Sequence, residues 1–288
     1  GHFQLLGLTV TLTALAATIR RRRVAVALVV LAVLQAIPLF HCMGPNPVPP
    51  DPRSSARLRL LMANLCAENA RHDALVRLIR REHPDIVGLV EFTPEWRDGL
   101  AEVRAGFPYR VEAPFGPMGL ALWFREPPLK AGPPEWLLAE GWPSLHAEVG
   151  FAGRPRHLWL VHPKSPFGRR GVPELAALAD RVRWTGGSRI VIGDLNSTEG
   201  SPFFADFLRG SGLRDTRLGF GRQPSWPVWI PLRIALDHAF VSGDLAVADR
   251  RLGPEIGSDH YPLILDLAPA VEPASAPSAA SSSSSRAK

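Results

Sequence analysis

Residues 189–196 read RIVIGDLN, in which an apolar strand-like run is followed by two polar side chains. Residues 190–192 form a short continuous apolar run, as expected of a strand that is buried on both faces. Asp194 and Asn196 follow where that strand ends. Polar groups at the ends of strands are a usual way for a rigid scaffold to build a site. The stretch therefore predicts a sheet with a chemical site at one edge.

The same arrangement recurs along the chain, because polar residues stand at the ends of other strand-like stretches. Taken singly, an Asn, Glu or His in such a place is more often a cap, a surface residue or a hydrogen-bonded core group. Here successive strand ends carry side chains of the kinds that phosphoryl chemistry uses. In chain order they are Asn64, Glu91, His162, Asp194 with Asn196, Asp237 with His238, and Asp259 with His260.

Strand-like and helix-like stretches alternate over residues 53–267, which predicts a layered α/β domain with helices outside mixed strands. The expected helices cover residues 70–82, 94–104, 173–184 and about 202–209. The expected strands cover residues 57–65, 85–91, 107–113, 118–125, 144–151, 157–162, 189–193, 234–241, 245–251 and 261–267.

The formal net charge of +6 belongs to the ends of the chain and not to this domain. The run Arg20–Arg23 lies near the start, Arg286 and Lys288 lie in the tail, and the domain itself is nearly neutral. Sequence-independent affinity for DNA comes mainly from basic residues that neutralise phosphates, so nucleic acid is not the favoured partner. The two cysteines, Cys42 and Cys66, have no metal-ligand spacing.

Two uncharged apolar runs, residues 5–19 and 24–40, flank Arg20–Arg23. A helix needs about 20 apolar residues, and at least about 17, to cross a bilayer. The second run just meets this limit, and the first meets it when residues 1–4 are included. Residues 1–43 are therefore predicted to form a transmembrane helical hairpin with its arginine-rich turn in the cytoplasm. This orientation places the following domain at the cell membrane, on the extracytoplasmic side.

Three alternatives for residues 1–43 stay open. A signal peptide would need a small-residue cleavage site, and none follows Phe40. A lipoprotein site at Cys42 would follow bulky residues, and a buried globular hairpin is disfavoured because no polar face interrupts either run. Beyond this segment, residues 44–52 hold five prolines and predict a stiff extended linker. Residues 268–288 are low in complexity and predict a disordered tail.

Taken together, the strand-end motifs resemble the endonuclease/exonuclease/phosphatase superfamily, which includes DNase I-like nucleases, sphingomyelinases and inositol polyphosphate phosphatases. The similar segments are MANL, VGLVEF, LVHP, IGDLN, ALDHAFVS and GSDHYPLI, in order over residues 57–267. The resemblance implies a four-layer α/β sandwich of the DNase I-like type, with its site at one edge of two packed sheets. His238 stands where many relatives have Tyr, as in membrane-linked bacterial members, and the short domain leaves little room for the inserted loops of DNA-binding relatives.

The resemblance also implies a Mg²⁺-dependent hydrolase of phosphate ester bonds, with Mn²⁺ as the alternative cofactor. Glu91 and Asn64 are the expected metal ligands, because Mg²⁺ prefers oxygen ligands and keeps several waters. The metal would polarise the phosphoryl group. Asp194 would orient or deprotonate a water that attacks phosphorus directly, without a covalent intermediate.

His260 is expected to stabilise the pentacovalent phosphorus or to protonate the leaving oxygen. Either Asp259 or Asp237 would fix the tautomer of a nearby His. The remaining contacts with phosphate or substrate are assigned to His162, Asn196, His238 and Trp226. For Trp226 and Trp229, contact with an apolar substrate, contact with a bilayer interface and ordinary packing all stay open.

The favoured function is a membrane-anchored phosphoesterase that acts on a phosphate ester or a lipid-linked phosphate or pyrophosphate. The first alternative is an extracytoplasmic endo- or exonuclease, which should carry a basic stripe beside the site. The second is a non-catalytic phosphate-binding module, which should have lost Glu91, Asp194 or His260. All three residues are present.

Overall fold

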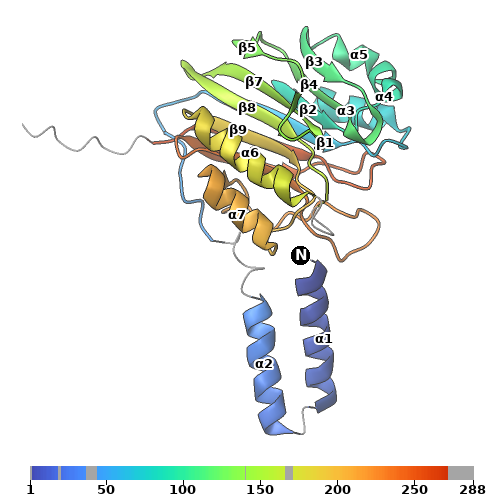
Figure 1. Cartoon of the computed structure of the whole chain (residues 1–288), viewed down its shortest axis with the longest axis vertical. Helices are drawn as coiled ribbons and strands as arrows, with labels where there is room; N and C mark the ends of the chain where they lie inside the picture. The colour runs from blue at the N-terminus through green and yellow to red at the C-terminus, as the bar shows by residue number, and fades with distance from the viewer. Residues whose placement is uncertain (1, 19–20, 37–43, 140, 166–170, 272–288) are drawn as a thin grey trace, which may run out of the picture.

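The computed structural model describes residues 2–18, 21–36, 44–139, 141–165 and 171–271. Two sheets pack face to face in the middle of the domain, and helices cover their outer faces (Figure 1). The order of layers is helix, sheet, sheet, helix, which confirms the predicted layered α/β architecture.

The first sheet has the strand order β12-β13-β1-β2-β4-β3. β1 pairs in parallel with β2 and antiparallel with β13, so the first and last of these strands in the chain lie side by side. The strands are β1 (Leu58–Asn64), β2 (Ile86–Val90), β3 (Tyr109–Ala113), β4 (Leu120–Phe124), β12 (Leu245–Leu252) and β13 (Leu263–Pro269).

The second sheet has the strand order β10-β11-β9-β8-β7-β5, and β6 pairs with β7 beside it. β8 and β9 are parallel, and β9 and β11 are antiparallel. The strands are β5 (Lys130–Ala131), β6 (Glu135–Trp136), β7 (Pro143–Phe151), β8 (Arg154–Val161), β9 (Arg189–Asp194), β10 (Arg214–Asp215) and β11 (Asp237–Val241).

Three apolar layers hold the domain together. The layer between the sheets includes Met62 and Ile192, and its members alternate along each strand with residues that face the helices. Helices α3 (His72–Glu82), α4 (Pro94–Gly99) and α5 (Ala101–Arg104) cover the first sheet, while α6 (Val172–Thr185) and α7 (Pro202–Ser211) cover the second. Both faces of each central strand are therefore buried, which explains the continuous apolar runs in the sequence.

Local differences from the predicted elements have physical causes. The expected helix 94–104 divides into α4 and α5 at Leu100, whose backbone is not helical. The expected strand 234–241 begins only at Asp237, because Ile234 instead exchanges two backbone hydrogen bonds with Trp226. Strands β5, β6 and β10 have two residues each, which is too short for a periodic pattern.

The proline-rich linker does not extend freely but runs along the domain. The side chain of Asn46 donates to Val247 O at 2.9 Å, and Pro50 forms a bridge with Ala270. The adjacent strand β13 continues to Pro269, two residues past the expected end of the domain. The rest of the predicted tail, residues 272–288, lies outside the described residues.

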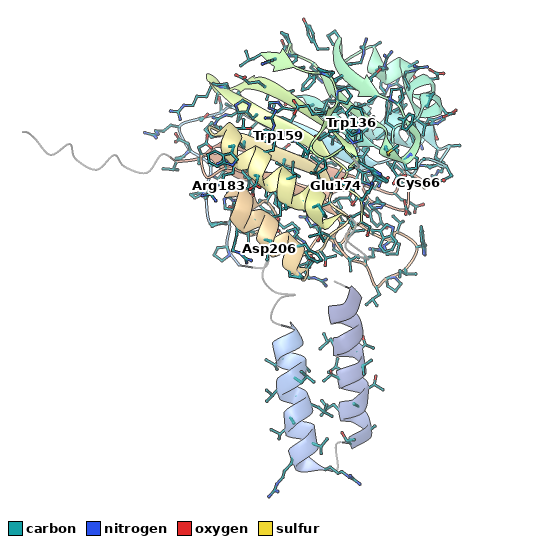
Figure 2. The ribbon with its side chains drawn as sticks, viewed as in Figure 1. Cys66, Trp136, Trp159, Glu174, Arg183 and Asp206 are labelled. Atoms are coloured by element: carbon teal, nitrogen blue, oxygen red, sulfur yellow. The ribbon has the colours of Figure 1, made fainter. Side chains whose placement is uncertain are left out.

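Helices α1 (His2–Thr18) and α2 (Arg22–Ala36) pack against each other near the N-terminus (Figure 1). Figure 2 draws the side chains of both helices as sticks, and large apolar ones are exposed, such as Val10, Val26 and Val33. Within the described residues, neither these helices nor any other has the length and apolar character that a membrane span requires. Arg20 and residues 37–43 of the predicted hairpin lie outside those residues.

Candidate active site

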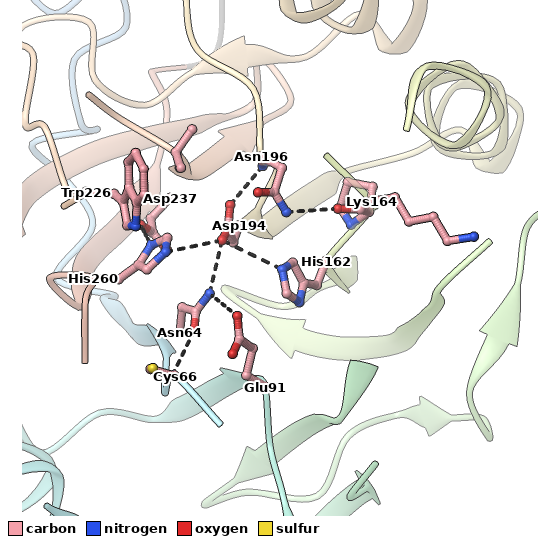
Figure 3. A network of polar contacts seen from close by, with 12 residues as sticks. Asn64, Cys66, Glu91, His162, Lys164, Asp194, Asn196, Trp226, Asp237 and His260 are labelled. Atoms are coloured by element: carbon pink, nitrogen blue, oxygen red, sulfur yellow. Dashed lines mark hydrogen bonds and ion pairs between the residues drawn. The ribbon is translucent and has the colours of Figure 1, made fainter. Parts of the chain in front are cut away.

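The predicted strand ends meet at one edge of the sandwich. β1 and β2 are parallel in one sheet and β8 and β9 are parallel in the other, so their polar residues gather at one edge of each sheet. A hydrogen bond between Asn64 and Asp194 joins these two edges. Asp194 at the end of β9 is the cross-strand partner of Asp237 at the start of β11. Figure 3 shows that side chains from both sheets converge there on Asp194.

Asn64 joins the two sheets at this edge. Its Nδ2 donates to Glu91 Oε1 and to Asp194 Oδ2, each at 3.0 Å. Its Oδ1 accepts the backbone N–H of Cys66 at 2.9 Å. The amide therefore presents N–H groups, not its oxygen, to the two carboxylates. This orientation differs from the predicted role of Asn64 as a metal ligand and makes it a residue that positions Glu91 and Asp194.

Glu91 follows β2 in an unusual backbone conformation, with φ of 58°. Such left-handed conformations cost a non-glycine residue about 1–3 kcal/mol and tend to occur at functional sites. Its Oε2 accepts the N–H of Ala67 at 3.0 Å, so a hydrogen bond holds each oxygen. The carboxylate is half-buried and has lone pairs left for another ligand.

Asp194 is almost fully buried, with 1% of its surface exposed. Its Oδ1 accepts the N–H of Asn196 at 2.8 Å, and its Oδ2 lies 3.7 Å from Nε2 of both His162 and His260. Burial raises the pKa of Asp194, and the two histidines act in the opposite direction. Gly193 makes this placement sterically allowed, because a Cβ there would lie 1.9 Å from Val161 O on β8.

His260 and Asp237 form a buried pair beside Asp194. Nδ1 of His260 lies 2.7 Å from Asp237 Oδ2. Burial alone would lower the pKa of His260, but Asp237 and then Asp194 raise it, to about 10. The open choice between Asp237 and Asp259 is thereby resolved. Asp237 orients His260, while Asp259 accepts the indole N–H of Trp226 at 2.9 Å.

His162 and Asn196 complete the cluster on the side of β8. His162 is 4% exposed, and its ring packs edge-on against Trp142, with centroids 4.8 Å apart. Asn196 has φ of 51°, a conformation that Asn tolerates better than most residues, and its Nδ2 donates to Pro163 O at 3.1 Å. Both side chains therefore lie at the same edge as Asp194.

His238 is the predicted site residue that the structure does not bring to the cluster. It alternates with Asp237 along β11, so it faces the opposite side of the sheet. There it is fully buried against Phe204 and Phe240, and its Nε2 lies 2.8 Å from Ser197 O. Burial lowers the pKa of His238 to about 4. A substrate cannot reach this ring from the site edge, and its neutral N–H instead supports the turn after Asp194.

Three supporting residues are absent from the sequence prediction. Ser258 Oγ accepts the N–H of His260 at 3.0 Å, Ser225 Oγ accepts the N–H of Asp237 at 3.3 Å, and Trp142 packs on His162. Ser258 carries a recognisable signal, since a serine hydroxyl commonly binds the N–H two residues later. Ser225 and Trp142 reach the site through tertiary contacts that no local pattern reports.

Two places in the site offer ligands for a divalent cation, namely the cluster of Asp194, Asp237 and His260 and the carboxylate of Glu91. Ligand atoms of Asp194, Asp237 and His260 lie within 4.8 Å of one another. However, Nδ1 of His260 already pairs with Asp237, so only Nε2 of this ring could face an ion. Glu91 is the better ligand, because its carboxylate is half-buried and held from two sides.

Comparison with solved structures gives similar domains at low sequence identity. D. rerio TDP2 complexed with single strand DNA product is 17% identical, with a TM-score of 0.62 over 74% of this chain and 99% of that one. An endonuclease/exonuclease/phosphatase family protein from Bacteroides thetaiotaomicron is 15% identical, with a TM-score of 0.60 over 74% of this chain and 98% of that one. One from Leptotrichia buccalis is 14% identical, with a TM-score of 0.61 over 73% and 99%. At these identities the similarity shows the fold alone.

No curated protein sequence matches the chain. The model of the Endonuclease/Exonuclease/phosphatase family does match, over residues 60–260, and this range runs from β1 to His260. It includes Glu91, Asp194 and Asp237 of the site. The match covers well over half of the sequence, and the chain therefore belongs to the endonuclease/exonuclease/phosphatase family, whose members are typically metal-dependent phosphoester hydrolases.

Proposed function

We propose that this chain is a Mg²⁺-dependent phosphoesterase held at a membrane, and that its substrate is a phosphate ester of a lipid or a lipid-linked phosphate. The observation that carries the catalytic part is the buried series Asp237–His260–Asp194–Asn64, which ends at Glu91. It places a cation, a carboxylate with a raised pKa and a half-buried metal-type carboxylate within one small cluster.

Glu91 would hold the metal ion, and Asn64 would keep Glu91 in place. A single protein carboxylate suits Mg²⁺, which keeps several waters and often shares its remaining positions with phosphate oxygens. When bound, the ion would polarise the phosphoryl group and reduce its repulsion of the attacking oxygen. Mn²⁺ is expected to substitute, since it also accepts carboxylate and water ligands.

Asp194 is the residue that would take a proton from the attacking water. A base works best when its pKa approaches the working pH, and burial raises the pKa of this carboxyl. As an imidazolium, His260 would donate its Nδ1–H to Asp237 and would still carry a second N–H on Nε2. That Nε2–H would donate to a phosphoryl oxygen as negative charge develops there.

His162 and Asn196 would contact the phosphoryl group or the leaving oxygen. Nε2 of His162 lies beside Asp194, on the opposite side of that carboxylate from His260 in Figure 3. The Asn196 amide uses one N–H on Pro163 O, and an Asn side chain has two such donors. Both groups can therefore bind the same phosphate that Asp194 and His260 act on.

The membrane part of the proposal is supported by the exposed apolar side chains of α1 and α2. Exposed side chains on α1 and α2 include Val10 at 60%, Val26 at 58% and Val33 at 55%. A helix that is apolar on every side is stable only when lipid or protein covers it. The arginine-rich turn Arg20–Arg23 would lie in the cytoplasm, which puts the domain on the extracytoplasmic side of the cell membrane.

Purified full-length protein tests the enzymatic proposal. It should hydrolyse bis-p-nitrophenyl phosphate or p-nitrophenyl phosphate with Mg²⁺ or Mn²⁺, and EDTA should abolish the activity. Asp194→Asn should lower kcat by orders of magnitude, while the matched control Asp206→Asn, at an exposed carboxylate on α7, should not. Activity that survives chelation would exclude the metal mechanism.

A substrate panel separates the proposed substrate class from a nuclease. Lipid phosphates in vesicles should be hydrolysed faster than plasmid or single-stranded DNA, whose binding would need a basic stripe. One arginine of the domain, Arg222, already has its Nε 3.6 Å from the carboxylate of Glu199. A preference for DNA would make the nuclease alternative the correct one. For topology, a periplasmic reporter fused after residue 52 should be active, and a cytoplasmic result would reverse the orientation.

A further inference from the structure

A short apolar loop stands beside the candidate active site. We define the apolar loop as residues 227–233, with the sequence PVWIPLR. Two backbone hydrogen bonds close its base, from Trp226 N to Ile234 O at 2.9 Å and from Ile234 N to Trp226 O at 2.7 Å. The loop is therefore a fixed projection of the domain.

The tip of the apolar loop exposes its largest side chains. Trp229 is 69% exposed, Leu232 is 48% exposed and Ile230 is 39% exposed. Single exposed apolar residues are normal on a soluble surface, but a contiguous group usually marks an interaction site. In the described part of the domain, the other large exposed apolar residues are separated in sequence.

The base of the apolar loop is bonded directly to the catalytic segment. Val228 N donates to Asp259 O at 3.0 Å, and the Trp226 indole donates to the Asp259 carboxylate. The Trp226 ring lies 6.3 Å from the ring of His260. Whatever the tip of the loop binds is therefore held a short distance from His260.

A second exposed apolar side chain lies at the same edge of the sandwich. Phe115, at 65% exposure, is in the loop before β4, and its N–H donates to Phe92 O, next to Glu91. By contrast, Trp184 lies near the end of α6, just before β9 starts, and so marks the opposite edge. Apolar groups thus project from both sheets around the mouth of the site.

A cation accompanies the apolar tip. The Arg233 guanidinium lies over the ring of Tyr261, 5.1 Å from its centroid, and its Nε has no hydrogen-bond partner among the described residues. Trp and aliphatic side chains at a tip with an adjacent Arg are the combination that suits a bilayer interface, where the rings meet the acyl boundary and the cation meets phosphate.

We infer that the apolar loop inserts into the surface of a phospholipid bilayer and brings the active site to phosphate groups at that surface. Trp229, Ile230 and Leu232 would enter the interface, with Arg233 at the level of anionic headgroups. The inference rests on the proposal that the protein works at a membrane, and it adds a second point of contact that does not depend on residues 1–43.

Bromine quenching of tryptophan fluorescence tests this contact directly. The full chain would be placed in phosphatidylcholine vesicles containing some phosphatidylglycerol, with or without brominated acyl chains. All eight tryptophans lie between residues 96 and 229, so residues 1–43 add no signal. Trp229→Phe should lose most of the bromine-dependent quenching, while the control Trp184→Phe should keep it. Leu232→Ser should weaken the quenching of Trp229, and Arg233→Gln should reduce its dependence on phosphatidylglycerol.

The outcomes separate this inference from the proposed function. Equal quenching in wild type and Trp229→Phe would overturn the loop contact, even if the protein still floats with vesicles. Protein that does not float at all would overturn both the membrane proposal and the loop contact. Self-association that Trp229→Phe abolishes, without bromine quenching, would assign the loop to a second copy of the chain. Hydrolysis of bis-p-nitrophenyl phosphate, measured without lipid, tests the catalytic proposal separately.

Discussion

Replacing Asp237 with Asn tests whether this carboxylate keeps His260 charged. Asp237 Oδ2 lies 2.7 Å from His260 Nδ1, and both side chains are buried. Burial would lower the pKa of His260, yet the neighbouring carboxylates raise it to about 10. The difference from the ordinary value of 6.5, at about 1.4 kcal/mol per pH unit, corresponds to about 5 kcal/mol in favour of the imidazolium.

Asp237→Asn removes the closest negative charge, so burial then dominates and the pKa of His260 should fall. The alkaline limb of the pH–rate profile, near pH 10 in the wild type, should move to lower pH. Because a correctly positioned acid–base group typically contributes about 10²–10⁴-fold, we expect a fall of that size in kcat at neutral pH.

The same substitution should change how stability depends on pH. A histidine with a raised pKa contributes stability that is complete below its ordinary pKa of 6.5 and is lost as the pH rises through about 10. Urea unfolding of the wild type should therefore show a decline between these values, of up to about 5 kcal/mol from this pair. The Asp237→Asn variant should be less stable at pH 6 and should show little of that decline.

The assay is hydrolysis of bis-p-nitrophenyl phosphate from pH 5 to pH 11 with saturating Mg²⁺. Asp259→Asn is the matched control, because Asp259 Oδ2 lies 4.0 Å from His260 Nε2 and bonds to Trp226. Its alkaline limb should move less than that of Asp237→Asn. Coincident profiles for Asp237→Asn and the wild type would refute the assigned pairing, whatever happens to kcat.

Three further substitutions test other parts of the structure. Because Glu91 is the proposed metal ligand, Glu91→Gln should lower kcat by at least about 10²-fold and abolish any rise in Tm on adding Mg²⁺. A Tm rise that the variant retains would show that the metal binds elsewhere. Arg217→Met should lower the free energy of unfolding in urea by about 3–5 kcal/mol, because it leaves Asp215 buried without its bonded cation and Glu199 with Arg222 alone. Burial raises the pKa of Asp215, but Arg217 outweighs it and lowers that pKa to about 2. The stability cost of Arg217→Met should therefore be complete above pH 3.8 and should shrink as the pH falls towards 2. His238→Phe should lower the free energy of unfolding by about 1–3 kcal/mol, because the hydrogen bond to Ser197 O in the turn after Asp194 is lost. KM should stay unchanged. A raised KM with unchanged stability would show that His238 contacts the substrate.

The cluster at the sheet edge was predictable because parallel strands bring their carboxyl ends together. Asn64, Glu91, His162 and Asp194 each follow an apolar strand, and the structure places all four within one hydrogen-bonded or ion-paired group. No side-chain geometry was needed for that grouping. The layered α/β architecture followed from the same alternation of strands and helices.

Details that depend on register or tertiary packing could not be read from the sequence. Asp237 and His238 are adjacent, and only the pairing of β11 with β9 decides which of the two faces the site. The orientation of the Asn64 amide depends on the backbone N–H of Cys66. The choice of Asp237 over Asp259 as the partner of His260 likewise depends on a distance between segments that local patterns do not contain.

The pairing of β1 with β13 has a consequence for the time at which activity can appear during synthesis. Leu58 pairs with Leu267, so the first sheet is incomplete until nearly the whole domain has left the ribosome. His260, immediately before β13, joins Asp194 only at that stage. Long-range pairing of this kind is slow compared with local helix formation. A nascent chain therefore lacks an assembled site until β13 has been synthesised and has paired with β1.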